Sequence, residues 1–169
     1  MSQTSFSIRQ ATGADRPGVV ALASRLAEGV APWRDQQEAR NAGRRWLESS
    51  LDDAAAGTGA VFLAVDEAAS AAPASPAAGG IVGVLSIHPS RHFTGELDGY
   101  IGELVVAEHA SRRGIGRALV DAADIWARDH DLAHLTLHTG SYNTSARAFY
   151  AALGFAEEEV RLTRQVSRQ

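Results

Sequence analysis

Arginines and glycines cluster in the middle of the chain, in the run Arg112, Arg113, Gly114, Ile115, Gly116 and Arg117. The residues before it, 100–107, are rich in apolar and β-branched types and predict a strand. Apolar residues spaced three and four apart then predict a helix that begins near Ile115. Backbone amides at a helix N-terminus bind phosphate, and the helix dipole and neighbouring arginines add to the attraction. The spacing therefore predicts an anion-binding loop between a strand and a helix.

The same loop fits no common nucleotide motif. A P-loop requires Gly-Lys-Ser or Gly-Lys-Thr, which this segment lacks. The dinucleotide fingerprint G-x-G-x-x-G/A is matched at Gly114 and Gly116, but Leu119 stands where the third small residue belongs. Taken alone, the segment leaves open a phosphate site or an ordinary strand-to-helix turn.

A second pattern lies downstream and reads N-x-x-A-x-x-F-Y-x-x-x-G-F, carried by Asn143, Ala146, Phe149, Tyr150, Gly154 and Phe155. Together with Leu104-x-Val106 and the run 113–119, it resembles the GNAT superfamily of acetyl-coenzyme A-dependent N-acetyltransferases. The resemblance is strong from about residue 100 to 155 and looser from 6 to 88. Ser111 stands where the family's loop pattern has glutamine or arginine, which removes a side-chain contribution but leaves the backbone cradle.

The resemblance implies an α/β (α+β) fold with a central mixed, mostly antiparallel sheet, flanked by helices, in which a parallel strand pair splays apart. The pantetheine arm of acetyl-coenzyme A would lie in that gap and pair with the backbone of Leu104, Val105 and Val106. The loop amides from Arg112 to Arg117 would hold the pyrophosphate, and the Asn143 side chain would bind the pantetheine arm. An amine of a small molecule or peptide would receive the acetyl group directly.

Three residues are candidates for the chemistry. Tyr150 matches the family tyrosine that approaches the thioester sulfur, and a phenol with a pKa near 10 can donate a proton to a thiolate. Glu103 heads the central strand on the acceptor side, where it would attract an ammonium and take its proton through water. His138, on the neighbouring strand, has an ordinary pKa near 6.5 that suits a base. Packing or structural hydrogen bonds are the alternative roles, and solvent is an alternative base.

Composition narrows the class of protein. The chain has 169 residues, 45% of them hydrophobic, which fits a single domain spanning residues 1–169. Its net charge of −4 argues against nucleic acid as a partner. The absence of cysteine excludes disulfides, zinc-thiolate sites and a cysteine acyl intermediate. Without an apolar run of ~20 residues or a signal-peptide core, we expect a cytoplasmic protein away from membranes. Because GNAT proteins are often dimers, a homodimer is an open expectation.

The N-terminal half is predicted to support the site. Strands are expected at 6–9, 60–65 and 80–87, with helices at 15–26 and 35–51. The helices would overhang the acceptor site, so that Trp33 and Trp46 either line a substrate pocket or pack internally. The run 66–80 is almost wholly Ala, Ser, Pro and Gly, and is predicted to be a mobile hairpin loop.

The connections and the C-terminal half complete the prediction. Residues 88–99 would form a loop that helps recognise the acceptor; they show no fixed metal-ligand spacing. The helix after Gly114 would bury the stripe Ile115, Ala118, Leu119, Ala122, Ile125 and Trp126. Residues 133–139 alternate as a half-buried strand does. A helix at 144–153 would begin at an Asn143 cap and end at Gly154, and residues 155–161 and 162–167 would close the sheet as an antiparallel hairpin.

Two other functions remain open at this point. A non-catalytic module that binds acyl-coenzyme A on the same fold would retain the same loop. A nucleotide-binding protein is disfavoured by the missing lysine and the missing third glycine.

Overall fold

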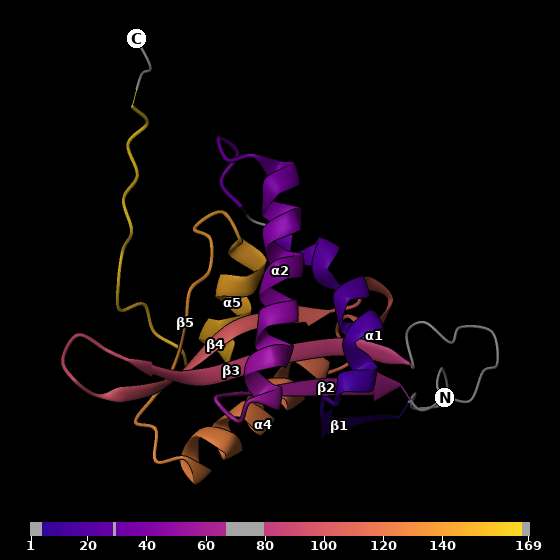
Figure 1. The fold of residues 1–169 in the computed structure, drawn as a ribbon. Coiled ribbons are helices and arrows are strands. Elements are labelled where there is room, and N and C mark those ends of the chain that lie inside the picture. Colours follow the sequence, from indigo (N-terminus) through magenta and orange to yellow (C-terminus); the bar gives the residue numbers. More distant parts are fainter. Residues whose placement is uncertain (1–4, 29, 67–79, 167–169) are drawn as a thin grey trace.

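The computed structural model describes residues 5–28, 30–66 and 80–166. One five-stranded sheet runs through it in the order β1-β2-β3-β4-β5 (Figure 1). The strands are β1 (Phe6–Gln10), β2 (Ala60–Asp66), β3 (Ile81–Arg91), β4 (Leu97–Val106) and β5 (Leu135–Leu137). The helices are α1 (Arg16–Ala21), α2 (Gln36–Ala55), α4 (Ile115–Asp129) and α5 (Thr144–Ala152), with 3-10 turns η1 (Gly13–Asp15), η2 (Ala23–Ala27) and η3 (Glu108–Ala110).

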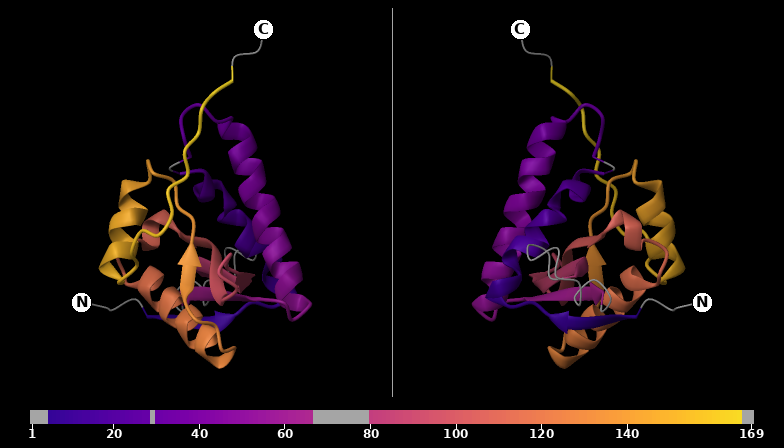
Figure 2. Two further views of the ribbon diagram at one scale, coloured as in Figure 1. Left: turned by 90° about the vertical axis from the view of Figure 1, so that its left-hand side faces the viewer. Right: turned by 90° about the vertical axis from the view of Figure 1, so that its right-hand side faces the viewer.

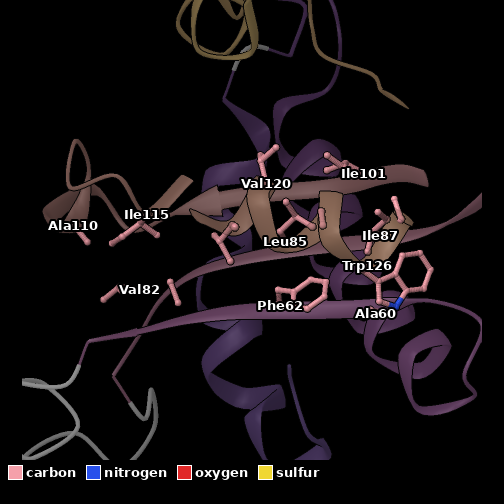
Figure 3. Packing of buried hydrophobic residues seen from close by; sticks show 14 of the residues in the cluster. Ala60, Phe62, Val82, Leu85, Ile87, Ile101, Ala110, Ile115, Val120 and Trp126 are labelled. Carbon is pink, nitrogen blue, oxygen red and sulfur yellow. The ribbon is translucent and has the colours of Figure 1, made fainter. Parts of the chain in front are cut away.

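Helices cover both faces of the sheet, with α1 and α2 on one side and α4 and α5 on the other (Figure 2). Alternate strand residues point to opposite faces, and each face has its own apolar core. On the α2 side, Leu47 and Leu63 are fully buried. On the α4 side, Leu119 and Trp126 pack against strand residues such as Leu85 (Figure 3). Within the described ranges, none of the helices is long and apolar enough to span a membrane.

The sheet is mixed, as predicted. The first four strands pair antiparallel, whereas β5 runs parallel to β4. The parallel pairing extends only from Gly99↔Leu135 to Ile101↔Leu137. Strand β4 continues to Val106 while β5 has already ended, so the two strands part beyond Ile101.

A β-bulge interrupts β4 where the strands part. Leu104 pairs with Leu85 and Ile101 pairs with Ile87, so Gly102 and Glu103 together oppose Ser86. A Cβ atom on Gly102 would lie 2.8 Å from Ser86 Oγ, which is too close for any other residue type without a shift. The bulge turns Glu103 toward α2.

Helix starts and stops follow the local sequence. Asp35 caps α2 by accepting from the amides of Gln37 and Glu38 at 2.8 and 2.9 Å. Asn143 caps α5 by accepting from Ala146 N at 3.1 Å, as predicted. Gly154 follows α5 with a positive φ of 91°, which also matches the prediction.

Several predicted boundaries were wrong. Strand β3 continues through His88 to Arg91, so the expected loop at 88–99 is mostly strand with a short tip. Strand β5 is shorter than the alternating segment suggested. Ile125, predicted to lie on the buried stripe of its helix, is 55% exposed because it lies outside the stripe that α4 buries. The predicted mobile loop at 66–80 lies, from 67 to 79, outside the described residues. Gly29, at which the sequence predicts the end of the first helix, also lies outside them.

The predicted C-terminal hairpin is also absent. Residues 155–166 contain no strand. The physical reason is the missing turn, since this segment has no Gly, Pro, Asn or Asp to reverse the chain. The segment instead extends away from the helices (Figure 1).

Candidate active site

The loop before α4 presents an open helix N-terminus. Arg112 and Gly114 both adopt left-handed backbone conformations, with φ of 62° and 84°. No side chain caps the helix, and the first amide that bonds back within it is Ala118 N, which donates to Gly114 O at 3.0 Å. The amides of the first turn therefore have no partner among the described residues. They are arranged to bind an anion, with the positive end of the helix dipole behind them.

The three arginines of this loop are not equivalent. Arg112 and Arg117 are exposed. Arg113 instead donates to Asp66 Oδ2 at 2.7 Å, and this ion pair ties the loop to the end of β2. Arg112 and Arg117 are therefore the arginines available to a phosphate.

Gly116 has a packing role that its sequence pattern did not reveal. A Cβ atom at this position would lie 3.0 Å from the ring of Phe149. The missing side chain therefore lets α4 and α5 pack closely, in addition to any contact with a ligand. A bulky residue at Gly116 would disturb this packing whether or not a ligand binds.

The backbone of β4 is open beyond the parallel pairing. Ala107 N donates to Val82 O at 2.8 Å, so its backbone faces β3. Because backbone direction alternates, Val105 also faces β3, whereas Leu104 and Val106 face the gap. Arg25 Nη1 donates to Val106 O at 2.9 Å and already occupies that carbonyl. Of Leu104, Val105 and Val106, which were predicted to pair with the pantetheine arm, Leu104 is the residue whose N–H and C=O both face the gap without a described partner.

Tyr150 lies on α5, half-buried between the rings of Phe149 and Phe155, whose centroids are 5.1 and 5.4 Å away. Burial raises the pKa of the Tyr150 phenol to about 12. The hydroxyl makes no hydrogen bond to the described part of the chain. At any working pH it is therefore protonated and able to donate.

Asn143 is committed to its helix. Its Oδ1 holds the α5 cap, and Nδ2 makes a long contact of 3.5 Å to Glu28 O. Only the Nδ2 group has capacity left for a pantetheine arm.

The Glu103 carboxylate is buried, at 8% exposure, and is held by two hydroxyls. Ser50 Oγ on α2 donates to Oε2 at 3.0 Å, and Ser86 Oγ on β3 donates to the same oxygen. The Glu103 amide in turn donates to Ser86 Oγ at 3.0 Å. Oε1 has no hydrogen-bond partner within the described ranges. Neither serine was foreseen, because nothing in the sequence pairs residues 17 or 53 positions away with Glu103.

Tyr100 is a further residue that sequence reasoning missed. Its hydroxyl lies 2.9 Å from Nδ1 of His138, so the structure joins this predicted base candidate to the central strand. Burial, and then the negative charge of Glu103, raises the pKa of Tyr100. The ring of His88 on β3 also lies near the Tyr100 ring, at a centroid distance of 5.3 Å. The bulge was the missing signal, since it brings positions 100 and 103 to the same face.

This geometry agrees with a comparison against known families. The family model described as "Acetyltransferase (GNAT) family" matches residues 25–155. The chain belongs to the GNAT acetyltransferase family. No curated protein sequence matches this GNAT chain.

Solved structures share the GNAT fold at low sequence identity. An acetyltransferase from Trypanosoma brucei has a TM-score of 0.65 and 21% identity, with 96% of this chain and 100% of that one covered. Glucosamine-6-phosphate N-acetyltransferase from Arabidopsis thaliana has a TM-score of 0.64 and 16% identity, covering 96% and 99%. An aminoglycoside N-acetyltransferase in complex with coenzyme A has a TM-score of 0.67 and 19% identity, covering 95% of each chain. At these identities the likeness shows the fold alone.

Two of the three tryptophans of this GNAT domain, Trp33 and Trp46, are exposed. Trp33 is 45% exposed and meets Tyr142 edge-on at 5.7 Å, which joins the segment before α2 to the loop before α5. Trp46, on α2, is 58% exposed. Internal packing therefore does not describe them, and a substrate-contacting role stays a prediction.

Proposed function

We propose that the protein transfers an acetyl group from acetyl-coenzyme A directly to a primary amine of a small molecule or peptide, within a ternary complex. The observation that carries the proposal is the combination of an open helix N-terminus at α4 with the parted strands β4 and β5. Family membership supports the acetyl transfer, and the buried carboxylate of Glu103 supports an amine as the acceptor.

The pyrophosphate would bind the first-turn amides of Ile115, Gly116 and Arg117, with Arg112 and Arg117 neutralising its charge. The pantetheine arm would lie along β4 and pair with the backbone of Leu104. Arg113 would act indirectly, by holding the loop through Asp66.

The acceptor would enter from the α2 side as an ammonium. Glu103 attracts this charge, and its Oε1 is the oxygen with capacity to accept a proton through water. His138 is the second candidate base, and its ring is positioned by Tyr100. Both groups are on the face where the bulge directs Glu103.

In the transfer, the amine nitrogen forms a bond to the acetyl carbon while the carbon–sulfur bond breaks. A proton leaves the nitrogen and one is taken up by sulfur. A backbone amide of the open β4 segment would stabilise the oxyanion, and the Tyr150 hydroxyl would donate to the departing sulfur.

Thiol release from acetyl-coenzyme A, measured with a panel of aminoglycosides, polyamines, amino acids and peptides, tests this proposal. We expect amine-dependent release and an acetylated amine of the matching mass. Tight coenzyme A binding with no turnover on any amine class would instead assign a binding module. A thermal shift with ATP or NAD but none with coenzyme A would overturn the proposal.

A further inference from the structure

Asp98 is a second buried carboxylate on β4, and the acetyl transfer described above does not use it. The residue is 5% exposed, and its Oδ1 accepts from Nδ1 of His134 at 3.1 Å. Its Oδ2 has no hydrogen-bond partner within the described ranges. Burial of a carboxylate is costly unless the group is paired or fully hydrogen-bonded. Asp98 therefore has the capacity, and an energetic reason, to bind a further donor.

Asp98 lies on the same face of β4 as Tyr100 and Glu103. A Cβ atom on Gly99 would lie 3.4 Å from a side chain of α4, so Gly99 faces the α4 side. Because side chains alternate, its neighbours Asp98 and Tyr100 face the α2 side. The bulge directs Glu103 to that side as well, where it is bonded to α2. One face of the strand thus presents a carboxylate, an aromatic ring and a second carboxylate in order.

The pairing with β3 sets the distance between the two carboxylates. Asp98 pairs with Ser90, and the bulge that contains Glu103 lies opposite Ser86. These serines are four residues apart on an extended strand, which corresponds to about 13 Å. If each carboxylate binds an ammonium at ~2.8 Å, the two nitrogens lie roughly 7 Å apart when both are in line and roughly 13 Å apart when both bind from the side.

The two carboxylates have no fixed positive partner. Among the described residues, no arginine forms an ion pair with Asp98 or Glu103, and the whole sequence contains no lysine. His134 supplies a positive charge only when it is protonated. A third buried acid, Asp66, is by contrast paired with Arg113 at 2.7 Å. A ligand with two positive charges would supply both of the missing partners.

The stretch between the carboxylates is apolar and reachable from solvent. The Tyr100 ring is partly exposed, and its hydroxyl lies 2.9 Å from Nδ1 of His138. His88 and Ser90, on the neighbouring strand, are also partly exposed. The ring therefore offers an apolar surface on which methylene groups can pack.

We propose that the acceptor is a linear diamine or polyamine, whose reacting nitrogen lies at Glu103 and whose second ammonium is bound by Asp98. The carbon chain between them runs along β4 over the Tyr100 ring. The assignment of the reacting end rests on the proposed function, whereas binding of the second ammonium does not require acetyl transfer. Propanediamine is too short to reach both carboxylates, and a monoamine leaves Asp98 without a partner.

Calorimetry without an acetyl donor tests the site itself. Octanediamine, propanediamine and octylamine are titrated into the protein, with and without coenzyme A. We expect octanediamine to bind roughly 10- to 150-fold more tightly than either of the other amines, because it alone makes the second charge-assisted hydrogen bond. Asp98→Asn should remove this advantage and leave the affinity for octylamine unchanged. The matched control Asp124→Asn removes the same charge on the α4 side and should keep the advantage.

Three results would overturn the proposal. The first is equal affinity of the wild-type protein for octanediamine and octylamine, a comparison that needs no variant and so does not depend on how well Asp98→Asn folds. The second is an advantage of octanediamine that survives Asp98→Asn, or a loss that is equally large for octylamine. The third is tighter binding of the aminoglycoside kanamycin than of octanediamine, which would rule out a linear ligand.

Thiol release from acetyl-coenzyme A separates this proposal from the proposed function. Asp98→Asn should lower kcat/KM for octanediamine by roughly 10- to 150-fold and leave octylamine turnover unchanged. Binding that depends on Asp98, with no turnover of any amine, would refute acetyl transfer and leave the second-ammonium site in place. Equal turnover of octanediamine by wild type and Asp98→Asn would refute the site and leave acetyl transfer in place.

Discussion

Replacement of Tyr150 by phenylalanine tests how the departing sulfur is stabilised. Burial raises the pKa of this phenol to about 12, whereas a thiol has an ordinary pKa of about 8.5. Complete proton transfer from phenol to thiolate would therefore be uphill by about 3.5 pKa units, or roughly 5 kcal/mol. The hydroxyl would thus stabilise the sulfur as a hydrogen-bond donor and keep its proton.

A hydrogen bond to a charged group contributes about 1.5–3 kcal/mol. We therefore expect Tyr150→Phe to lower kcat by roughly 10- to 150-fold, since each 1.36 kcal/mol is a factor of ten. The Kd for coenzyme A should change little, because the ring remains between Phe149 and Phe155. Thermal stability should hold or rise, because the variant removes a hydroxyl that has no partner in the described structure.

The assay is thiol release with the amine selected by the acceptor panel, together with calorimetry for coenzyme A. The pH profile adds a second readout. With a pKa raised to about 12, Tyr150 stays protonated through alkaline pH, so wild-type kcat should show no decline from this group near pH 10. Wild-type turnover in Tyr150→Phe would reassign the residue to packing. A loss beyond roughly 10³-fold would refute the hydrogen-bond argument and favour full acid catalysis.

Three other predictions concern the acceptor, the coenzyme and the fold. Glu103→Gln should reduce the rate at all working pH values, by roughly 10²-fold or more, and His138→Gln should have a milder effect. A pH–rate profile of Glu103→Gln with the height and shape of wild type would contradict Glu103 as the base. Replacing Arg112 and Arg117 together by alanine should weaken the binding of coenzyme A, measured by calorimetry, and leave the binding of pantetheine, which lacks phosphate, unchanged. Equal losses of affinity for both ligands would contradict phosphate recognition. The Arg9 guanidinium holds the pKa of Asp15 well below 3.8, so Asp15→Asn should cost about 1 kcal/mol in urea unfolding at neutral pH. Because the pKa of Asp15 is lower in the folded than in the unfolded chain, the ionised carboxylate stabilises the fold above pH 3.8, and this stabilisation is lost as the pH falls below that value. A stability difference between wild type and Asp15→Asn that already fades at pH 5 would contradict the ion pair.

Element identity was predictable wherever the local sequence is decisive. The start of α2 at Asp35, the cap at Asn143 and the stop at Gly154 are short-range features, and each lies where the sequence predicted it. The loop between β4 and α4, predicted to bind phosphate, could be placed from the sequence because a strand, a glycine-rich turn and an apolar stripe follow one another directly. The different roles of the three arginines in this loop could not be predicted, since the partner of Arg113 is Asp66, 47 positions away.

The surroundings of Glu103 were harder to predict because they depend on the register between strands. A strand read with strict alternation puts Tyr100 and Glu103 on opposite faces. The bulge reverses that phase, and it is specified by pairing with β3 rather than by residues within β4. The C-terminal hairpin was wrongly predicted for a simpler reason: residues 155–166 lack the turn residues that a hairpin requires.

The glycine inside the bulge offers a way to change the orientation of Glu103 without replacing Glu103 itself. Gly102 leaves room for the Ser86 hydroxyl. That hydroxyl accepts a hydrogen bond from the Glu103 amide and donates one to the Glu103 carboxylate. A single methyl group at position 102 would press on Ser86 Oγ and shift both of these bonds together. On the proposed function, substitutions at position 102 would change the orientation of the Glu103 carboxylate by steric pressure and thereby grade the rate, while the residues proposed to bind the coenzyme stay unchanged.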